Sequence, residues 1–228
     1  GSAEASNLLR DVITEARTHV MEHAFNAVTK RSIDMETIVN AALDPITLTT
    51  TFDQTNYFAR QLQVVARLIA ARGALGTKRQ VFFVSMGGFD NHDGLMTQHP
   101  ELMATFNSAV TSFYNATVEL GVANKVTTFT ASDFGRTLAY NGDGSDHGWG
   151  SHHFIMGGAV KGGQFYGTAP HISLETDDQV GQGRLLPSTA VDQMAATLGK
   201  WFGLSNSELT AVLPNIGRFA TSNLGFMG

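Results

Sequence analysis

One stretch, residues 126–163, constrains this chain most, because a short apolar run leads directly into a dense set of acidic and histidine side chains. It reads VTTFTASDFGRTLAYNGDGSDHGWGSHHFIMGGAVKGG. Residues 126–131 have the β-branched and aromatic composition of a buried strand, and the polar residues begin where that strand would end. Open α/β sheets place their ligand sites just beyond the carboxyl ends of strands. The stretch is therefore the predicted functional site.

A second stretch of the same character lies earlier in the chain. Residues 80–86, QVFFVSM, are a continuous apolar run that is typical of a central strand, and GGFDNHD follows at 87–93. The helical apolar spacing of residues 100–121 then completes a strand, helix, strand unit, which is expected to be parallel and right-handed. Asp90 and Asp133 are thus predicted to lie at the same edge of one sheet.

The rest of the chain favours helices. Segments with helical apolar spacing are 5–43, 54–73, 187–203 and 205–213. The sequence therefore predicts an α/β chain with helices around a largely parallel sheet. A helical N-terminal segment, residues 1–53, is expected to pack on the main domain, residues 54–228.

Composition excludes several classes of protein. The net charge of −5 and the scattered basic residues argue against nucleic-acid binding. No apolar run approaches the roughly 18 residues of a membrane span, and no signal peptide is recognisable. Cysteine is absent, which excludes disulfides and thiolate metal ligands. Gly1-Ser2 has the form of a cloning remnant, so the natural N-terminus is expected to be missing.

Carboxylates and imidazoles dominate the two polar stretches, and these are the preferred ligands of zinc, manganese and similar divalent ions. The side chains concerned are Asp90, His92, Asp133, Asp146, His147, His152 and His153. Two such ions would hold a phosphate-like or sulfate-like group and activate a nucleophile. The alternative is that the aspartates cap helices and turns while the histidines form hydrogen bonds within loops.

Arg136 is a candidate contact for a tetrahedral anion, since its planar guanidinium suits such groups. The alternative for Arg136 is a salt bridge to Asp133 or a nearby carboxylate. The turn at 141–146, NGDGSD, loosely resembles a calcium loop but lacks the spacing and the final glutamate of an EF-hand. Structural binding of calcium by this turn is nevertheless a further alternative.

Four motifs resemble, in their order along the chain, an uncharacterised bacterial family of Tat-exported, sulfatase-like proteins in the alkaline phosphatase superfamily. The motifs are FFVSMGGFDNHD, TTFTASDFGRT, NGDGSDHGWGSHHFIMGGAVKGG and LPSTAVDQMAATLGKWFGL, within Leu62 to Phe219. The resemblance implies an alkaline-phosphatase-like sandwich of helices around a largely parallel sheet, with a metal site at the strand ends. Members of that family are longer, so the chain is expected to be a C-terminal half with a sheet that is incomplete at its N-terminal side.

The resemblance also assigns roles to residues. Ser132-Asp133-Phe134-Gly135 resembles the superfamily's Ser-Asp-His-Gly metal motif, with Phe134 in place of the histidine. Asp90 and His92 look like the preceding Asp and His pair, and His147 or His153 matches the final histidine. Together with Arg136 and Asp146, which the residues themselves suggest, the candidates are Arg136 as the catalytic anion contact, and a metal set consisting of Asp90, His92, Asp133, Asp146, His147 and His153.

The resemblance implies a metal-dependent hydrolase of phosphate or sulfate esters that is periplasmic or exported. Its cofactor would be a divalent ion (zinc, manganese or calcium) and its substrate a small anionic ester. The alternative, which Phe134 favours, is a non-catalytic exported or cell-surface binding protein with a degenerate metal site. An incomplete sheet would expose an edge, so self-association or pairing with the missing N-terminal half is also expected.

Overall fold

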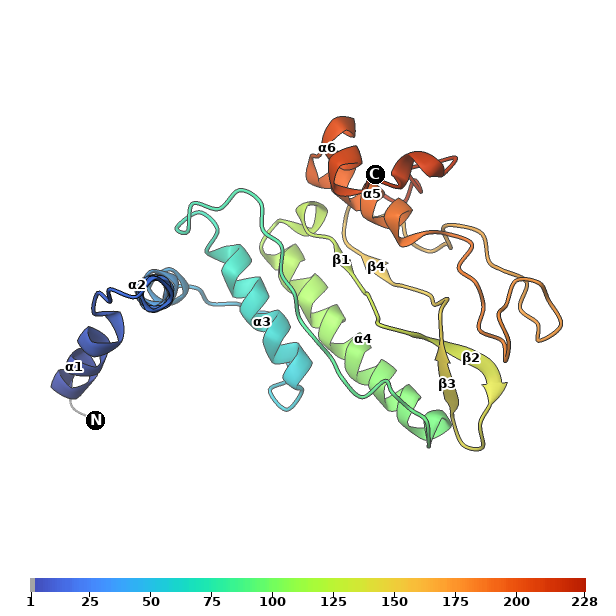
Figure 1. Ribbon diagram of the computed structural model, residues 1–228, viewed down its shortest axis with the longest axis horizontal. Coiled ribbons are helices and arrows are strands. Elements are labelled where there is room, and N and C mark those ends of the chain that lie inside the picture. Colours follow the sequence, from blue (N-terminus) through green and yellow to red (C-terminus); the bar gives the residue numbers. More distant parts are fainter. Residues whose placement is uncertain (1–2) are drawn as a thin grey trace. The chain divides into compact units, whose positions relative to one another are not determined.

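A computed structural model describes residues 3–228, and Figure 1 gives its elements. The chain divides into two compact units. One contains the residues up to Leu48 together with Arg67–Gln80, and the other contains Thr49–Ala66 together with Val81–Gly228. Helix α3, Tyr57–Ala70, runs across this division.

The first unit is built on helices α1, Ala3–Thr14, and α2, Val20–Leu43. The helical segment predicted over residues 5–43 is thus interrupted between these two helices. His19 caps the second helix, where its Nδ1 accepts a hydrogen bond of 3.3 Å from the Met21 amide. Asp34 pairs with Arg10 of α1 at 2.5 Å and with Lys30 of α2 at 3.0 Å. The break lets α1 turn back so that its arginine reaches this carboxylate.

The second unit has a helical core. Helix α4, Leu95–Glu119, lies beside α3, and both helices bury apolar side chains. The buried residues of the two helices in this unit include Phe58, Ala59, Leu62, Val65, Ala109, Val110, Phe113 and Ala116. The rings of Phe58 and Phe106 stack with centroids 6.0 Å apart, and Phe154 contacts Phe106 at 5.8 Å. The loop that contains Asp90 and His92 leads directly into α4.

The C-terminal helices follow the sequence signals. Helix α5, Val191–Phe202, ends at Gly203, whose φ of 109° is left-handed and suits glycine. Helix α6, Asn206–Val212, begins with a capping box in which Ser205 and Glu208 satisfy each other's backbone amides. Both predicted helices are therefore confirmed, as are the helices predicted over 54–73 and 100–121. Short 3-10 turns occur at Ala123–Lys125 and Ile216–Arg218.

The predicted parallel sheet, and with it the alkaline-phosphatase-like sandwich, is wrong. Residues 3–228 contain two antiparallel, two-stranded sheets instead. Strand β1, Thr128–Phe129, pairs with β4, Ile155–Met156, and β2, Gly135–Tyr140, pairs with β3, Ser145–Gly148. The strand predicted over residues 126–131 therefore pairs with β4, which lies 26 residues or more further along the chain, and not with residues 80–86.

The run at 80–86 is extended but belongs to neither sheet. Gln61 of α3 takes the place of a strand partner: its side-chain oxygen accepts from the Ser85 amide at 3.2 Å and its nitrogen donates to the Ser85 carbonyl at 2.8 Å. Val81 and Phe83 stay exposed. An apolar run signals an extended, β-prone backbone but does not specify its partner, which explains the wrong prediction.

No helix among residues 3–228 combines the length and the apolar composition required to cross a membrane.

Glu119, at the end of α4, forms hydrogen bonds with Thr49 and Thr50 at the start of the second unit. Its carboxylate accepts hydrogen bonds from the amides of Thr49 and Thr50, at 2.7 and 2.8 Å, and from the Thr50 hydroxyl at 2.6 Å. An acidic side chain in the last turn is disfavoured by the helix dipole. The hydrogen bonds from Thr50 and Thr49 nevertheless lower the pKa of Glu119 to about 2.

We expect this carboxylate to make stability depend on acid pH. Its pKa is about 2 in the folded chain and 4.5 as the reference value, so its contribution is complete above pH 4.5 and is lost as pH falls towards 2. Glu119→Gln should flatten the decline in the urea midpoint over that range. Glu101→Gln, which changes an exposed carboxyl of the same helix, is the control. Equal slopes for Glu119→Gln and the wild type would contradict the assignment.

Candidate metal site

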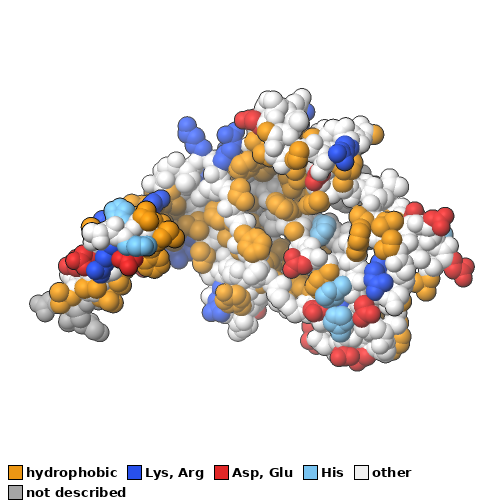
Figure 2. All heavy atoms as spheres, in the orientation of Figure 1, with side chains coloured by type: hydrophobic (Ala, Val, Ile, Leu, Met, Phe, Trp, Pro, Cys, Tyr) orange, Lys and Arg blue, Asp and Glu red, His pale blue; other side chains and the backbone are white. Residues whose placement is uncertain are grey.

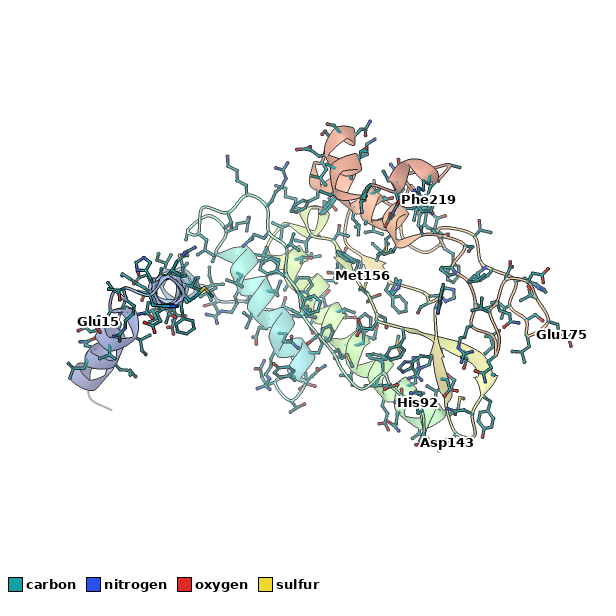
Figure 3. All side chains as sticks on the ribbon, in the orientation of Figure 1. Glu15, His92, Asp143, Met156, Glu175 and Phe219 are labelled. Carbon is teal, nitrogen blue, oxygen red and sulfur yellow. The ribbon has the colours of Figure 1, made fainter. Side chains whose placement is uncertain are left out.

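Two segments form the candidate site. One is the loop that follows residues 80–86 and supplies Asp90 and His92, and the other is the β2–β3 hairpin, which supplies His147. Figure 3 shows His92 and Asp143 close together at this end of the unit. Figure 2 shows histidine and acidic side chains side by side on the same surface. The site is thus open to solvent.

Three potential ligand atoms converge. The Asp90 Oδ1 atom lies 2.7 Å from His147 Nε2 and 3.0 Å from His92 Nε2, and the two Nε2 atoms are 3.3 Å apart. Around a tetrahedral ion with bonds of about 2.0–2.1 Å, ligand atoms are separated by about 3.3 Å. The separation of the two Nε2 atoms matches this value, and the two distances from Asp90 Oδ1 are shorter, so one small divalent ion could bind all three atoms after the carboxylate shifts slightly. All three side chains are exposed.

Asp90 is held in the ionised form that a metal ligand needs. The hydrogen bond from His147 is the main factor that lowers the pKa of Asp90, and the charges of His92, His147 and Arg136 act in the same direction, while desolvation opposes them. Ionised carboxylate is the form that coordinates divalent ions.

Asp146 lies behind His92 rather than with the three ligand atoms. Its Oδ1 is 3.3 Å from His92 Nδ1, the ring nitrogen that does not face Asp90. Asn141 donates to the same oxygen at 2.8 Å, and this hydrogen bond is the main factor that lowers the pKa of Asp146. The structure therefore separates Asp146 from the predicted ligand set and places it in contact with a ligand.

His147 is oriented by an aromatic ring. The rings of Phe134 and His147 are nearly parallel, at 7°, with centroids 3.8 Å apart. The Arg136 guanidinium carbon lies 5.1 Å from the centre of the Phe134 ring, a cation–π distance. Phe134 thus provides the surface on which His147 rests.

Arg136 connects the two segments. One of its terminal nitrogens donates to the carbonyl of Ser145 in the hairpin, and the other donates to the carbonyl of Phe89 in the loop. The second nitrogen also lies 3.5 Å from Asp90 Oδ1. Of the two predicted roles for Arg136, the structure contains the salt bridge, and its partner is Asp90.

Asp133 and His153 lie outside the convergent group. Asp133 is exposed in the segment between β1 and β2. His153 lies just before β4, with Nδ1 3.4 Å from the Thr130 hydroxyl, and burial and then the charge of His152 lower its pKa. In the part of the chain that the structure describes, the ligand atoms that meet belong to Asp90, His92 and His147 alone.

Two residues that shape the hairpin turn, Gly144 and Asn141, were not predicted as site residues. A Cβ atom at Gly144 would collide with the carbonyl oxygens of Asn91 and His92, because the turn lies directly against the backbone of the loop. Asn141 closes this turn by accepting from the Gly144 amide at 3.1 Å. The NGDG sequence was a recognisable turn signal, but nothing in it indicated the loop against which the turn packs.

Comparison with known proteins identifies the family. The model of the family described as Protein of unknown function (DUF1501) matches residues 3–214. The chain belongs to this family. Neither the search of curated proteins nor the search of solved structures gave a match. Membership of an uncharacterised family is thus confirmed.

The close approach at Gly144 makes a testable prediction. Gly144→Ala should force the hairpin away from the loop, lower stability by about 1–3 kcal/mol, as overpacked sites do, and separate His147 from His92. Thermal unfolding and the NMR signals of the two imidazole rings would report both effects. Gly87→Ala is the matched control, because a Cβ there meets nothing within 4 Å. If the two variants behave alike, the turn does not pack as described.

Proposed function

We propose that this chain is a divalent-metal-dependent hydrolase of phosphate or sulfate esters. Asp90, His92 and His147 would hold the ion, and their convergence within 4.8 Å is the observation that carries the proposal. Two imidazole nitrogens and one carboxylate oxygen form a set that suits zinc or manganese. Calcium fits less well, because it prefers a larger set composed of oxygen ligands.

Such a site can support hydrolysis because three protein ligands leave a coordination position of a tetrahedral ion open. A bound ion supplies a Lewis acid for an ester oxygen and lowers the pKa of a coordinated water. The protein's own contribution is to hold the three donor atoms together at a solvent-exposed position that a small ester can reach.

The nature of the ester rests on the resemblance to exported, sulfatase-like proteins. A tetrahedral anion is consistent with the surroundings, since Arg136 places a guanidinium 3.5 Å from the ligand Asp90. The same resemblance supports a periplasmic or exported location.

A second candidate function is a non-catalytic binding protein. The observation that favours it is the state of Arg136, whose two terminal nitrogens are both bound to backbone carbonyls, of Ser145 and Phe89. A guanidinium held in this way stabilises the site and has fewer N–H groups left for a substrate. In that case the site would bind an ion or an anion without turnover.

Metal analysis followed by turnover assays separates the two candidates. Protein purified without a histidine tag should carry about one equivalent of zinc or manganese, as expected for a single three-ligand site. His147→Ala combined with Asp90→Asn should abolish binding, and Asp133→Asn, outside the group, should retain it.

The same samples are then assayed with p-nitrophenyl phosphate and p-nitrophenyl sulfate. Turnover that disappears with the metal supports the hydrolase, and metal binding without turnover on a wide ester panel supports the binding protein. A wild-type protein that takes up neither zinc nor manganese would contradict both candidates.

Self-association is a further proposal, and it rests on residues 81–84. Val81 and Phe83 are 81% and 92% exposed on an extended backbone that, within residues 3–228, pairs with no strand. Extended, apolar segments of this kind are templates for pairing between chains. We expect the average mass by light scattering to rise with concentration. Phe83→Lys should suppress the rise, whereas Val118→Lys, on an exposed position of α4, should not. A wild-type monomer at all concentrations would rule this out.

A further inference from the structure

We propose that Asp146 is a positioning residue that fixes the ring of His92 so that Nε2, and not Nδ1, is presented to a metal ion. This inference rests on the proposed metal site and assigns to Asp146 a role other than that of a ligand.

The two nitrogens of His92 face different partners. Nε2 lies 3.0 Å from Asp90 Oδ1 and 3.3 Å from His147 Nε2, on the side where the ligand atoms converge. Nδ1 lies 3.3 Å from Asp146 Oδ1 on the opposite side. An ionised carboxylate only accepts hydrogen bonds, so a carboxylate 3.3 Å from Nδ1 favours the hydrogen on that nitrogen. An ion that replaces the proton on Nε2 then meets a lone pair that is already correctly directed.

Asp146 is itself held in place by the hairpin. The Asn141 side chain donates to its Oδ1 at 2.8 Å, and the Asp146 amide donates to the Thr137 hydroxyl at 3.2 Å. Thr137 is buried, and Asn141 is anchored by the Gly144 amide at 3.1 Å. The carboxylate is therefore oriented by contacts that do not involve the ion.

Asp146 cannot act as a fourth ligand in this arrangement. It is not a member of the group whose ligand atoms all lie within 4.8 Å of one another, and an imidazole ring separates it from their meeting point. His147 is positioned differently, by stacking on Phe134. Removing the Asp146 carboxylate should consequently disturb one of the two histidine ligands and leave the other in place.

Zinc titration of the full chain tests the affinity part of this inference. Asp146→Ala should bind zinc 10- to 100-fold more weakly than the wild type, the range typical for loss of a carboxylate behind a histidine ligand, with unchanged stoichiometry. Asp143→Asn removes a charge three residues away on the same turn and should bind like the wild type. Asp146→Asn keeps the size and an acceptor oxygen, so its affinity should lie between those of the wild type and Asp146→Ala.

Nitrogen-15 NMR of the His92 ring, assigned by its loss in His92→Gln, supplies the readout that a merely structural role would not affect. The zinc-loaded wild type should show a protonated Nδ1 and a single mode of ligation through Nε2. Asp146→Ala should show faster exchange of the Nδ1 proton or a mixture of ligation through both nitrogens.

Failure of the inference can be told apart from failure of the proposed function. If the wild type binds zinc and Asp146→Ala changes neither the affinity nor the ring spectrum, the positioning role is overturned and the metal site stands. If the wild type binds no zinc, the metal site is overturned and the positioning role falls with it.

Discussion

The contact of Arg136 with two backbone carbonyls is the interaction on which the rest of the site depends. Through Ser145 it holds the hairpin, and through Phe89 it holds the loop that carries Asp90 and His92. Hydrogen bonds from a charged donor are stronger than neutral ones, and a planar guanidinium fixes the geometry of both at once. This link, together with the packing of Gly144 against the loop, keeps His147 within 2.7 Å of Asp90, a residue 57 positions earlier.

The two histidines are held by different means, which gives the site its precision despite its exposure. A carboxylate faces the outer nitrogen of His92, while an aromatic ring supports the face of His147. Asp146 lies in the hairpin and Phe134 directly precedes it. The glycine at 144 lets that hairpin lie against the backbone of the loop. Exposed ligands without such support would lose affinity to the conformational freedom of their side chains.

The extended run at 80–86 illustrates how an apolar segment can be structured without a sheet. Gln61 provides one donor and one acceptor to Ser85, the same pair of bonds that a neighbouring strand would offer. The segment is thereby fixed on α3 and delivers the following loop to the site. The geometry of the candidate site thus depends on a helix and a hairpin, although the sequence pattern suggested a parallel sheet.

The sequence by itself determined the helices of residues 54–73, 100–121, 187–203 and 205–213, because apolar spacing, caps and glycine stops are local signals, as at Ser205 and Gly203. It also identified the two stretches that contain the candidate ligands, since clustered carboxylates and imidazoles are visible without a fold. Only the tertiary structure decided which of them meet: it joined Asp90 and His92 to His147 and left Asp133 apart. Strand partners and ligand groupings depend on contacts between distant residues, and periodicity carries no information about those.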